Sequence, residues 1–200
     1  KIPQSTKIQI FHGTHNIDFI KDNLKEEIDG GRIILTNLNK ENIDRHYYSD
    51  LLTSKHFWDK IDGEQVLIFQ TDSCLCSNPK HDIDYFLEYG YVGGPLKKND
   101  DDNAIVYQNG GFSLRRKSAM LKAIKTKKKD ENTWPCDYWF SQKKKYIVKP
   151  APYKVAKDFA IERVYSDRPY GVHKPWAFLK KNELDKLRKD CPEIKTIFGK

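Results

Sequence analysis

Residues 65–73 read QVLIFQTDS, an apolar run that leads directly into polar residues. The run over residues 65–69 is apolar at both odd and even positions, which is typical of a strand covered on both faces in a parallel sheet. It therefore predicts a central strand. Ligands of parallel α/β sheets bind beyond the C-terminal ends of the strands, and Asp72 is expected at that edge.

The N-terminal residues predict a strand, a helix and a second strand. Residues 7–11 (KIQIF) and 32–36 (RIILT) have the apolar character of short strands. Over residues 17–28, apolar side chains recur every three or four positions, which is helical spacing. A crossover helix of this kind joins parallel strands, so we predict a β-α-β unit.

The rest of the chain continues this alternation. Apolar spacing predicts helices over residues 47–61, 118–124 and 182–189, the last capped by Asn182, and residues 155–164 predict another strand. Alternating strands and helices are typical of an α/β fold. We therefore predict a single α/β domain over residues 1–200, with a mainly parallel central sheet flanked by helices.

The composition excludes several classes of protein. The chain has 200 residues, 38% hydrophobic and 32% charged, which is typical of a folded chain and not of a disordered one. The longest apolar runs have about five residues, far fewer than the roughly 20 that span a bilayer. The net charge of +8 favours an anionic partner such as nucleic acid, a phosphorylated cofactor or an acidic surface. Because the chain opens on Lys1 and not on Met, we expect a processed or trimmed piece, in which any upstream targeting signal would be invisible.

The cysteines predict no disulfide scaffold and no structural zinc site. There are four, Cys74, Cys76, Cys136 and Cys191, without the paired spacing of zinc ligands. We expect them to be mostly free thiols.

Three segments carry candidate site residues. An acid directly after a buried strand is costly unless it meets solvent, a donor or a cation, so Asp72 either caps a turn or binds a cation. Residues 109–116 (NGGFSLRR) form either a plain turn or a ligand loop, in which the glycines let the backbone approach the ligand. In residues 167–176 (DRPYGVHKPW), His173 is either structural or a metal ligand, and Lys174 can meet a phosphate.

Taken in order, five blocks of sequence resemble a known family. The blocks are 66–73 (VLIFQTDS), 91–93 (YVG), 109–115 (NGGFSLR), 137–141 (DYWFS) and 171–176 (GVHKPW). This ordered set resembles a metal-dependent, nucleotide-sugar glycosyltransferase of the Rossmann-like GT-A fold. The nearest resemblance is to a family of giant viruses and microbes that includes a collagen hydroxylysine-linked glucosyltransferase.

The resemblance implies a divalent cation, Mn²⁺ or Mg²⁺, on the diphosphate of the donor. Asp72 corresponds to the final acid of the family's D-x-D motif, and Gln70 stands where the first acid is usual. Gln70 is therefore expected to touch the nucleotide or a metal-bound water. By the same resemblance, His173 would be the second metal ligand and Lys174 a diphosphate contact.

The resemblance also implies where the donor and the acceptor bind. It assigns a donor half to about residues 1–115 and an acceptor and metal-closing half to about residues 116–200. Asp137 is expected to orient or deprotonate the acceptor hydroxyl, although an N-cap role is the alternative. The residues expected to contact the UDP-sugar, besides Gln70 and Lys174, are Thr14, Lys55, Thr71, Asn109, Gly110, Gly111 and Trp176.

The function implied is transfer of a hexose, glucose, from a UDP-sugar to a hydroxyl acceptor, with retention of configuration favoured. The expected acceptor is galactosylhydroxylysine of a collagen-like protein, and a second copy of the chain is a further expected partner. As a viral protein the chain would act in the host cytoplasm or the ER lumen. Two alternatives remain, a metal-dependent phosphodiesterase or nuclease and a basic nucleic-acid-binding module. The second would use the lysines at 122, 125, 127–129 and 143–145, although no nucleic-acid-binding motif accompanies them.

Overall fold

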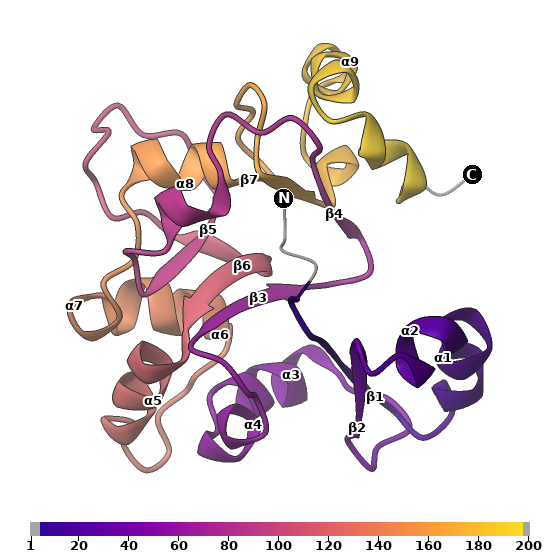
Figure 1. The fold of residues 1–200 in the computed structure, drawn as a ribbon. Coiled ribbons are helices and arrows are strands. Elements are labelled where there is room, and N and C mark those ends of the chain that lie inside the picture. The colour runs from indigo at the N-terminus through magenta and orange to yellow at the C-terminus, as the bar shows by residue number, and fades with distance from the viewer. Residues whose placement is uncertain (1–4, 198–200) are drawn as a thin grey trace. The chain divides into compact units, whose positions relative to one another are not determined.

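The structure, a computed structural model, describes residues 5–197 (Figure 1). The chain divides into two compact units, Lys1–Tyr48 and Ser49–Lys200. The α/β class is confirmed, since both units combine helices with strands. One domain with halves that meet near residue 115 stays a prediction. No helix among the described residues is long and apolar enough to cross a membrane.

The first unit is a parallel β-α-β unit, as predicted. Strand β1 (Ile8–His12) pairs in parallel with β2 (Ile33–Asn37). The crossover consists of two short helices, α1 (Ile17–Asn23) and α2 (Lys25–Asp29), in place of the single helix expected. Leu24 interrupts the helix because its φ of −130° lies outside the helical range.

The second unit contains two three-stranded sheets. Their strands are β3 (Gln65–Phe69), β4 (Ser73–Leu75), β5 (Tyr91–Pro95), β6 (Gln108–Arg116), β7 (Ala160–Ile161) and β8 (Gly171–His173). The first sheet has the order β3-β6-β5 and is antiparallel. The second has the order β4-β8-β7, in which β4 runs antiparallel and β7 parallel to β8.

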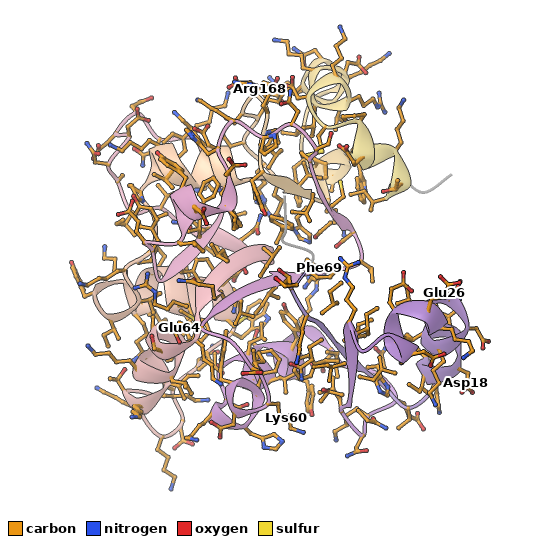
Figure 2. All side chains as sticks on the ribbon, in the orientation of Figure 1. Asp18, Glu26, Lys60, Glu64, Phe69 and Arg168 are labelled. Atoms are coloured by element: carbon orange, nitrogen blue, oxygen red, sulfur yellow. A yellow bond between two sulfur atoms is a disulfide. The ribbon has the colours of Figure 1, made fainter. Side chains whose placement is uncertain are left out.

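The mainly parallel central sheet is not confirmed. Residues 65–69 do form a strand, β3, but it lies at the edge of an antiparallel sheet and not at the centre of a parallel one. Phe69, at its end, is 55% exposed (Figure 2). An apolar run indicates that a strand is covered, but it specifies neither the number nor the direction of the neighbouring strands.

The helices of the second unit are short. Helix α3 (Arg45–Leu52) spans the boundary between the units. The others are α4 (Lys55–Asp59), α5 (Lys117–Lys125), α6 (Cys136–Tyr138), α7 (Lys145–Val148), α8 (Tyr153–Phe159), α9 (Lys181–Asp190) and the tighter or wider turns η1 (Ile83–Phe86), η2 (Trp139–Lys143), η3 (Pro175–Ala177) and η4 (Pro192–Thr196).

The helix expected over residues 118–124 is confirmed as part of α5, whereas three other predictions need correction. The helix over 47–61 is divided into α3 and α4, because the Ser54 hydroxyl accepts the Phe57 N–H and starts a new helix. Of residues 155–164, the first five belong to α8, and only the two-residue strand β7 follows. Asn182 does not cap α9, which begins one residue earlier.

Two apolar clusters contribute to the core of the second unit. The first joins the antiparallel sheet to α8, which packs on β5, and its buried members are Phe86, Val92, Phe112, Leu114, Ala151, Val155, Phe159, Ala160 and Tyr170. The second joins the β4-β8-β7 sheet to α9 and η4, and its buried members are Cys76, Ile161, Val172, Leu179, Leu187, Cys191 and Ile194.

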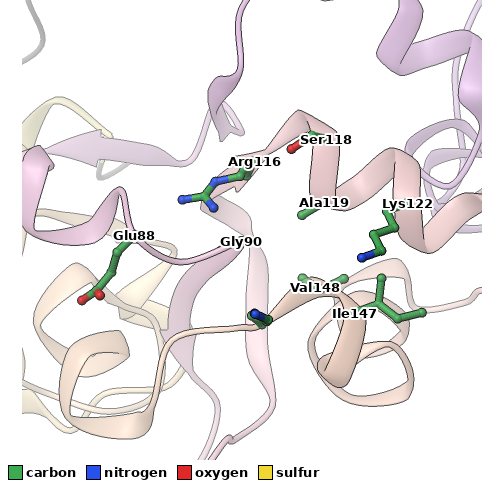
Figure 3. A pocket seen from close by; sticks show the side chains of 9 residues that line it. Glu88, Gly90, Arg116, Ser118, Ala119, Lys122, Ile147 and Val148 are labelled. Atoms are coloured by element: carbon green, nitrogen blue, oxygen red, sulfur yellow. The ribbon is translucent and has the colours of Figure 1, made fainter.

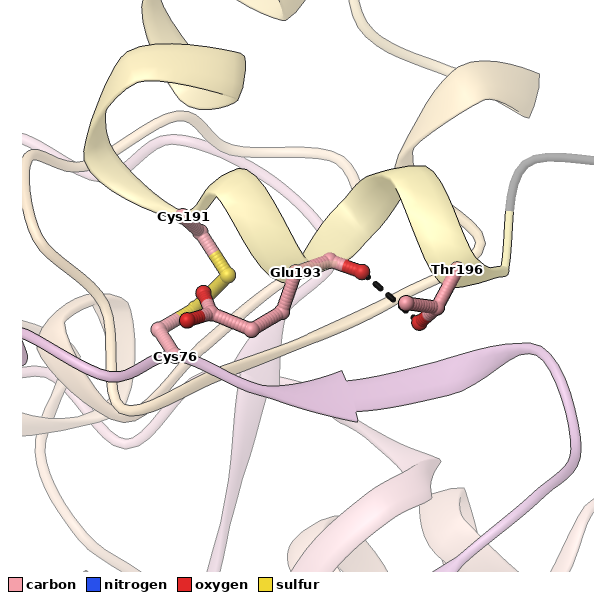
Figure 4. Close-up of a disulfide and its surroundings, with 4 residues drawn as sticks. All are labelled: Cys76, Cys191, Glu193 and Thr196. Carbon is pink, nitrogen blue, oxygen red and sulfur yellow. Dashed lines mark hydrogen bonds between the residues drawn. A yellow bond between two sulfur atoms is a disulfide. The ribbon is translucent and has the colours of Figure 1, made fainter.

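A disulfide links Cys76 to Cys191 inside the second cluster (Figure 4). The expectation of free thiols is therefore wrong for this pair, and it holds for Cys74 and Cys136. The two bonded cysteines are 115 residues apart in the sequence, so no local spacing could have paired them.

Glu131 connects the loop after α5 with the segment that follows α6 through hydrogen bonds and an ion pair. Its carboxylate accepts the indole N–H of Trp139 at 2.9 Å and the N–H of Lys128 at 3.0 Å, and it pairs with Lys144 at 3.2 Å. Burial by itself would raise the pKa of Glu131, but these partners outweigh it and lower the pKa from 4.5 to about 2.

We expect Glu131→Gln to lower the free energy of unfolding by about 2 kcal/mol at neutral pH, because a charged hydrogen-bond acceptor is lost. The folded state favours the ionised form, so this stabilisation is complete above the ordinary pKa of 4.5 and is lost as the pH falls towards about 2. Denaturant unfolding of both proteins at several pH values measures the difference. A difference in unfolding free energy that stays constant down to about pH 2 would contradict the role of the Glu131 charge.

Candidate active site

At one edge of the second sheet, each of its three strands begins or ends at, or next to, a polar residue. His173 ends the central strand β8, Asp72 directly precedes β4, and Glu162 directly follows β7. In the antiparallel register Ser73 lies opposite His173, and the parallel register of β7 places Glu162 beside His173. Asp72 and Glu162 therefore flank His173 from the two neighbouring strands.

The imidazole ring of His173 contacts oxygen atoms at both nitrogens. Nε2 lies 3.2 Å from Gln70 Oε1 and 3.3 Å from Asp72 Oδ1. Nδ1 lies 3.2 Å from Glu162 Oε2. The structure thus brings together Gln70, Asp72 and His173, the residues for which the sequence predicted contact with metal or nucleotide.

Gly111 on β6 admits the His173 ring to this edge. A Cβ atom at residue 111 would lie 2.3 Å from ring atoms Cε1 and Nε2, a distance that no side chain can accept. The Gly111 carbonyl also accepts the Gln70 N–H at 2.8 Å and the Ser73 hydroxyl at 3.2 Å. Gly111 therefore joins the two sheets at the site, and its predicted contact with the donor sugar stays a prediction.

The atoms that face His173 Nε2 fit a divalent cation. Asp72 Oδ1 is buried and accepts no hydrogen bond, which is costly for a carboxylate unless a cation reaches it. An octahedral ion with ligands about 2.1 Å away separates neighbouring ligand atoms by about 3.0 Å. The two contacts of Nε2, at 3.2 and 3.3 Å, are close to this spacing.

The chemistry of these donors is that of a hard or borderline ion. Within residues 5–197, no three His, Cys, Asp or Glu side chains converge as metal ligands. The amide oxygen of Gln70, 3.2 Å from His173 Nε2, would be the third protein donor, whereas the resemblance implies a contact with the nucleotide or a metal-bound water. One imidazole nitrogen with two oxygens suits Mn²⁺ or Mg²⁺ better than a metal that prefers sulfur.

Asp137 is the second residue of α6, and Pro135 stands at the N-cap position. The alternative that Asp137 caps this helix is therefore wrong. Its Oδ1 atom accepts the hydroxyl of Tyr107 at 3.0 Å and the N–H of Tyr138 at 2.8 Å. These two bonds fix one carboxylate oxygen of Asp137.

The pKa of Asp137 is raised above its ordinary value. Burial is the main cause and the Glu162 carboxylate adds to it, while the Tyr107 hydrogen bond and the Arg115 charge act in the opposite direction. Because Glu162 also contacts His173, Asp137 and the sheet edge share one electrostatic environment. A carboxylate with a raised pKa suits a group that exchanges a proton near neutral pH.

Gly110 and Arg115 lie beside Asp137. A Cβ atom at residue 110 would lie 2.9 Å from the Arg115 guanidinium and 3.1 Å from Asp137 Cβ. Arg115 is fully buried, lies over the Tyr91 ring at 4.9 Å and donates from Nε to Ser113 at 3.0 Å. This places a buried positive charge close to the candidate catalytic carboxylate.

Asn109 is buried next to these glycines. Its Oδ1 atom accepts the Phe112 N–H at 3.4 Å, and its Nδ2 atom is buried and makes no hydrogen bond within the described part of the chain. An unsatisfied buried donor is costly, which is consistent with the predicted contact of Asn109 with a ligand.

Three residues predicted to contact the UDP-sugar lie close in the sequence to the residues of this sheet edge. Thr71 is exposed in the turn between β3 and β4, and Lys174 is exposed directly after β8. The N–H of Lys174 donates to the Asp72 carbonyl at 3.0 Å, which fixes its backbone at the edge. Trp176 is half-buried in η3.

Two further predicted contacts, Lys55 and Thr14, belong to other segments of the chain. Lys55 lies on α4, and its ammonium group pairs with Asp59 at 2.6 Å. Thr14 belongs to the first unit, where it is exposed after β1 and its N–H donates to the Lys40 carbonyl at 2.9 Å. Their contacts with the nucleotide stay predictions.

Sequence reasoning missed Glu162 and Tyr107, and it named Arg115 only as a hydrogen-bonding member of the 109–116 segment. Glu162 did carry a signal, because it follows the apolar residues of β7 as Asp72 follows those of β3. The signal was lost because residues 155–164 were interpreted as one strand. No local pattern marks Tyr107, since its partner Asp137 is 30 residues away.

A separate hollow of about 250 Å³ lies between α5 and α7 (Figure 3). It is lined by Glu88, Gly90, Arg116, Ser118, Ala119, Lys122, Ile147, Val148 and Lys149. None of the predicted site residues lines it, so the candidate site does not include this hollow.

Comparison with known proteins supplies a family and no described activity. Searches of curated proteins and of solved structures found no match. One family model matches residues 32–173, a segment that begins next to β2 and ends on His173. This match includes every candidate residue from Lys55 to His173, and it leaves out Thr14, Lys174 and Trp176. The chain belongs to the family described as "Protein of unknown function (DUF5672)".

Proposed function

We propose that this protein is a metal-dependent glycosyltransferase of the GT-A type that moves a hexose from a UDP-sugar to a hydroxyl acceptor. The observation that carries the proposal is the meeting of Gln70, Asp72 and His173 at one sheet edge over Gly111. These residues come from three of the five sequence blocks on which the resemblance rests.

The chemistry of glycosyl transfer explains why such a group of donors is needed. A nucleoside diphosphate leaves only when its developing negative charge is neutralised. A bound Mn²⁺ or Mg²⁺ supplies this neutralisation as a Lewis acid. Asp72, His173 and Gln70 would hold the ion, and the exposed Lys174 beside them would add positive charge for the diphosphate.

Asp137 and its neighbours account for the acceptor side of the reaction. The Tyr107 hydroxyl and the Tyr138 N–H hold one oxygen of the Asp137 carboxylate. The other oxygen is then available to orient the acceptor hydroxyl or to accept its proton. Asn109 and Gly110 border the same region, where the predicted contacts with the donor sugar would lie.

The proposal also names the sugar, the acceptor and the cellular location. Glucose as the sugar and galactosylhydroxylysine of a collagen-like protein as the acceptor are carried over from the resemblance. The net charge of +8 is suited to an anionic donor. The Cys76–Cys191 disulfide favours the oxidising ER lumen over the cytoplasm.

UDP release is the measurement that tests the proposal. The purified protein would be incubated with a panel of sugar nucleotides, with Mn²⁺ or with EDTA, with and without galactosylhydroxylysine. We expect metal-dependent release of UDP from one donor. If no sugar nucleotide releases UDP with any acceptor and UDP does not bind, the proposal is wrong.

We expect Asp137→Asn to lower turnover by about a hundredfold or more while UDP affinity changes less than about threefold, because general acid–base groups contribute this much to the rate. The asparagine keeps the oxygen that accepts from Tyr107 but cannot accept the proton. In the unchanged protein, turnover should fall at acidic pH with a midpoint above the ordinary aspartate pKa. Equal losses of turnover and UDP affinity would point to misfolding or a donor role.

Replacement of the lysines at 127–129 distinguishes the proposed transferase from the alternative, a basic nucleic-acid-binding module. All three are exposed after α5. We expect their combined replacement by alanine to leave UDP release with a small acceptor within about twofold, because exposed charges away from the reacting atoms contribute little to the chemical step. An inactive enzyme would show that this surface belongs to the site. Salt-sensitive nucleic-acid binding that persists in Asp72→Ala would favour the binding module.

A further inference from the structure

We propose that Glu162 is a positioning residue that holds the His173 ring with Nε2 directed towards Asp72 and Gln70. This inference deepens the proposed function and rests on it, since the orientation matters only if Nε2 binds a metal ion. Nothing in the sequence motifs assigns a role to Glu162.

The contact between Glu162 and His173 is within hydrogen-bond distance and largely shielded from solvent. Glu162 Oε2 lies 3.2 Å from His173 Nδ1, and the two side chains are 9% and 12% exposed. A carboxylate can only accept a hydrogen bond, so the proton of this bond is assigned to Nδ1. The opposite nitrogen, Nε2, then faces the oxygens of Gln70 and Asp72.

The surrounding structure leaves the ring little freedom to turn. The backbone of Gly111 lies against the ring atoms around Nε2, where even a methyl group would not fit. The parallel pairing of β7 with β8 fixes Glu162 beside His173. The other carboxylate oxygen of Glu162 lies 3.7 Å from Nε of the half-exposed Arg163, beyond hydrogen-bond distance, so this pair contributes little to the position of the acid.

A metal-binding histidine commonly donates its second N–H to a carboxylate, which fixes the tautomer and makes the ligating nitrogen more basic. Loss of that carboxylate typically weakens metal binding by about 10- to 100-fold. Glu162 occupies this position for His173, whereas Asp72 lies on the opposite side of the ring. The three side chains therefore have separate tasks and do not form one set of three metal ligands.

Mn²⁺ binding measures the effect without reference to turnover. Free Mn²⁺ would be followed by electron paramagnetic resonance in titrations of the unchanged protein, Glu162→Ala, Glu162→Gln and Arg163→Ala. We expect Glu162→Ala to weaken Mn²⁺ binding by about 10- to 100-fold. Glu162→Gln should lie between Glu162→Ala and the unchanged protein, because an amide oxygen can still accept from Nδ1. Arg163→Ala is the matched control, and it should stay within about twofold.

A nitrogen-15 NMR spectrum of the histidine rings gives a second readout on the metal-free protein. We expect a proton on Nδ1 of His173 in the unchanged protein and in Glu162→Gln, with its hydrogen-bonded signal lost in Glu162→Ala. His173→Gln identifies the signal. Glu162→Gln keeps the size of the side chain, so it also tests the bond if the alanine variant fails to fold.

The outcomes separate this inference from the proposed function. Unchanged Mn²⁺ affinity in Glu162→Ala, or an unprotonated Nδ1 in the unchanged protein, would overturn the role of Glu162 even if UDP is released. The expected NMR and Mn²⁺ results without UDP release from any donor would support Glu162 and overturn the transferase. A protein that binds no Mn²⁺ or Mg²⁺ would overturn both.

Discussion

Replacement of Asp72 or of His173 by alanine is expected to lower metal-dependent UDP release by about a thousandfold, because each removes a ligand of the ion that stabilises the leaving group. Such stabilisation contributes several kcal/mol to the transition state, and about 4 kcal/mol corresponds to a thousandfold in rate. The two side chains meet at 3.3 Å, so the loss of either one breaks the same group of donors.

Mn²⁺ titration, UDP binding and UDP release on each variant would measure this effect. Asp100→Ala is a suitable control, since Asp100 is an exposed acid in the loop after β5. We expect the control to keep full activity. Unchanged activity in either Asp72→Ala or His173→Ala would remove that residue from the metal site.

The second large effect is expected from the Cys76–Cys191 disulfide. We expect the double replacement of Cys76 and Cys191 by alanine to lower the free energy of unfolding by about 4 kcal/mol, because the bond closes a long loop and restricts the unfolded chain. The corresponding fall in melting temperature is about 10 °C for a chain of this size. Both cysteines belong to the apolar cluster that packs against β4 and β8. Because Asp72 and His173 stand at the ends of these strands, the candidate site should also become less rigid.

Thermal melting with and without a reductant measures this contribution. The reductant should lower the melting temperature of the unchanged protein and leave the double variant unaffected. Cys74→Ala is the matched control, since Cys74 is a free thiol on β4 whose pKa is raised to about 11, by burial and by Glu193. We expect that control to stay within about 1 kcal/mol. Four free thiols in the native protein would contradict the bond.

Much of the candidate site could be predicted because its residues lie next to strand ends. Asp72 follows an apolar run, and His173 stands in a distinctive block with Lys174 and Trp176. Gly111 was selected for its lack of a side chain, but only the structure shows that the His173 ring needs the space. Glu162 could not be given a role from the sequence, because that role depends on the pairing of β7 with β8. A strand of two residues is too short to show a hydrophobic periodicity.

The sequence by itself determined the parallel β-α-β unit of residues 8–37 and helix α5, since both are built from consecutive segments of the chain whose apolar patterns are local. Only the tertiary structure decided that β3 is an edge strand of an antiparallel sheet, that Cys76 meets Cys191 and that Glu162 faces His173. Apolar periodicity reports which side of an element is covered, and it carries no information on which distant element covers it. Those pairings follow from the packing of distant segments into shared apolar clusters.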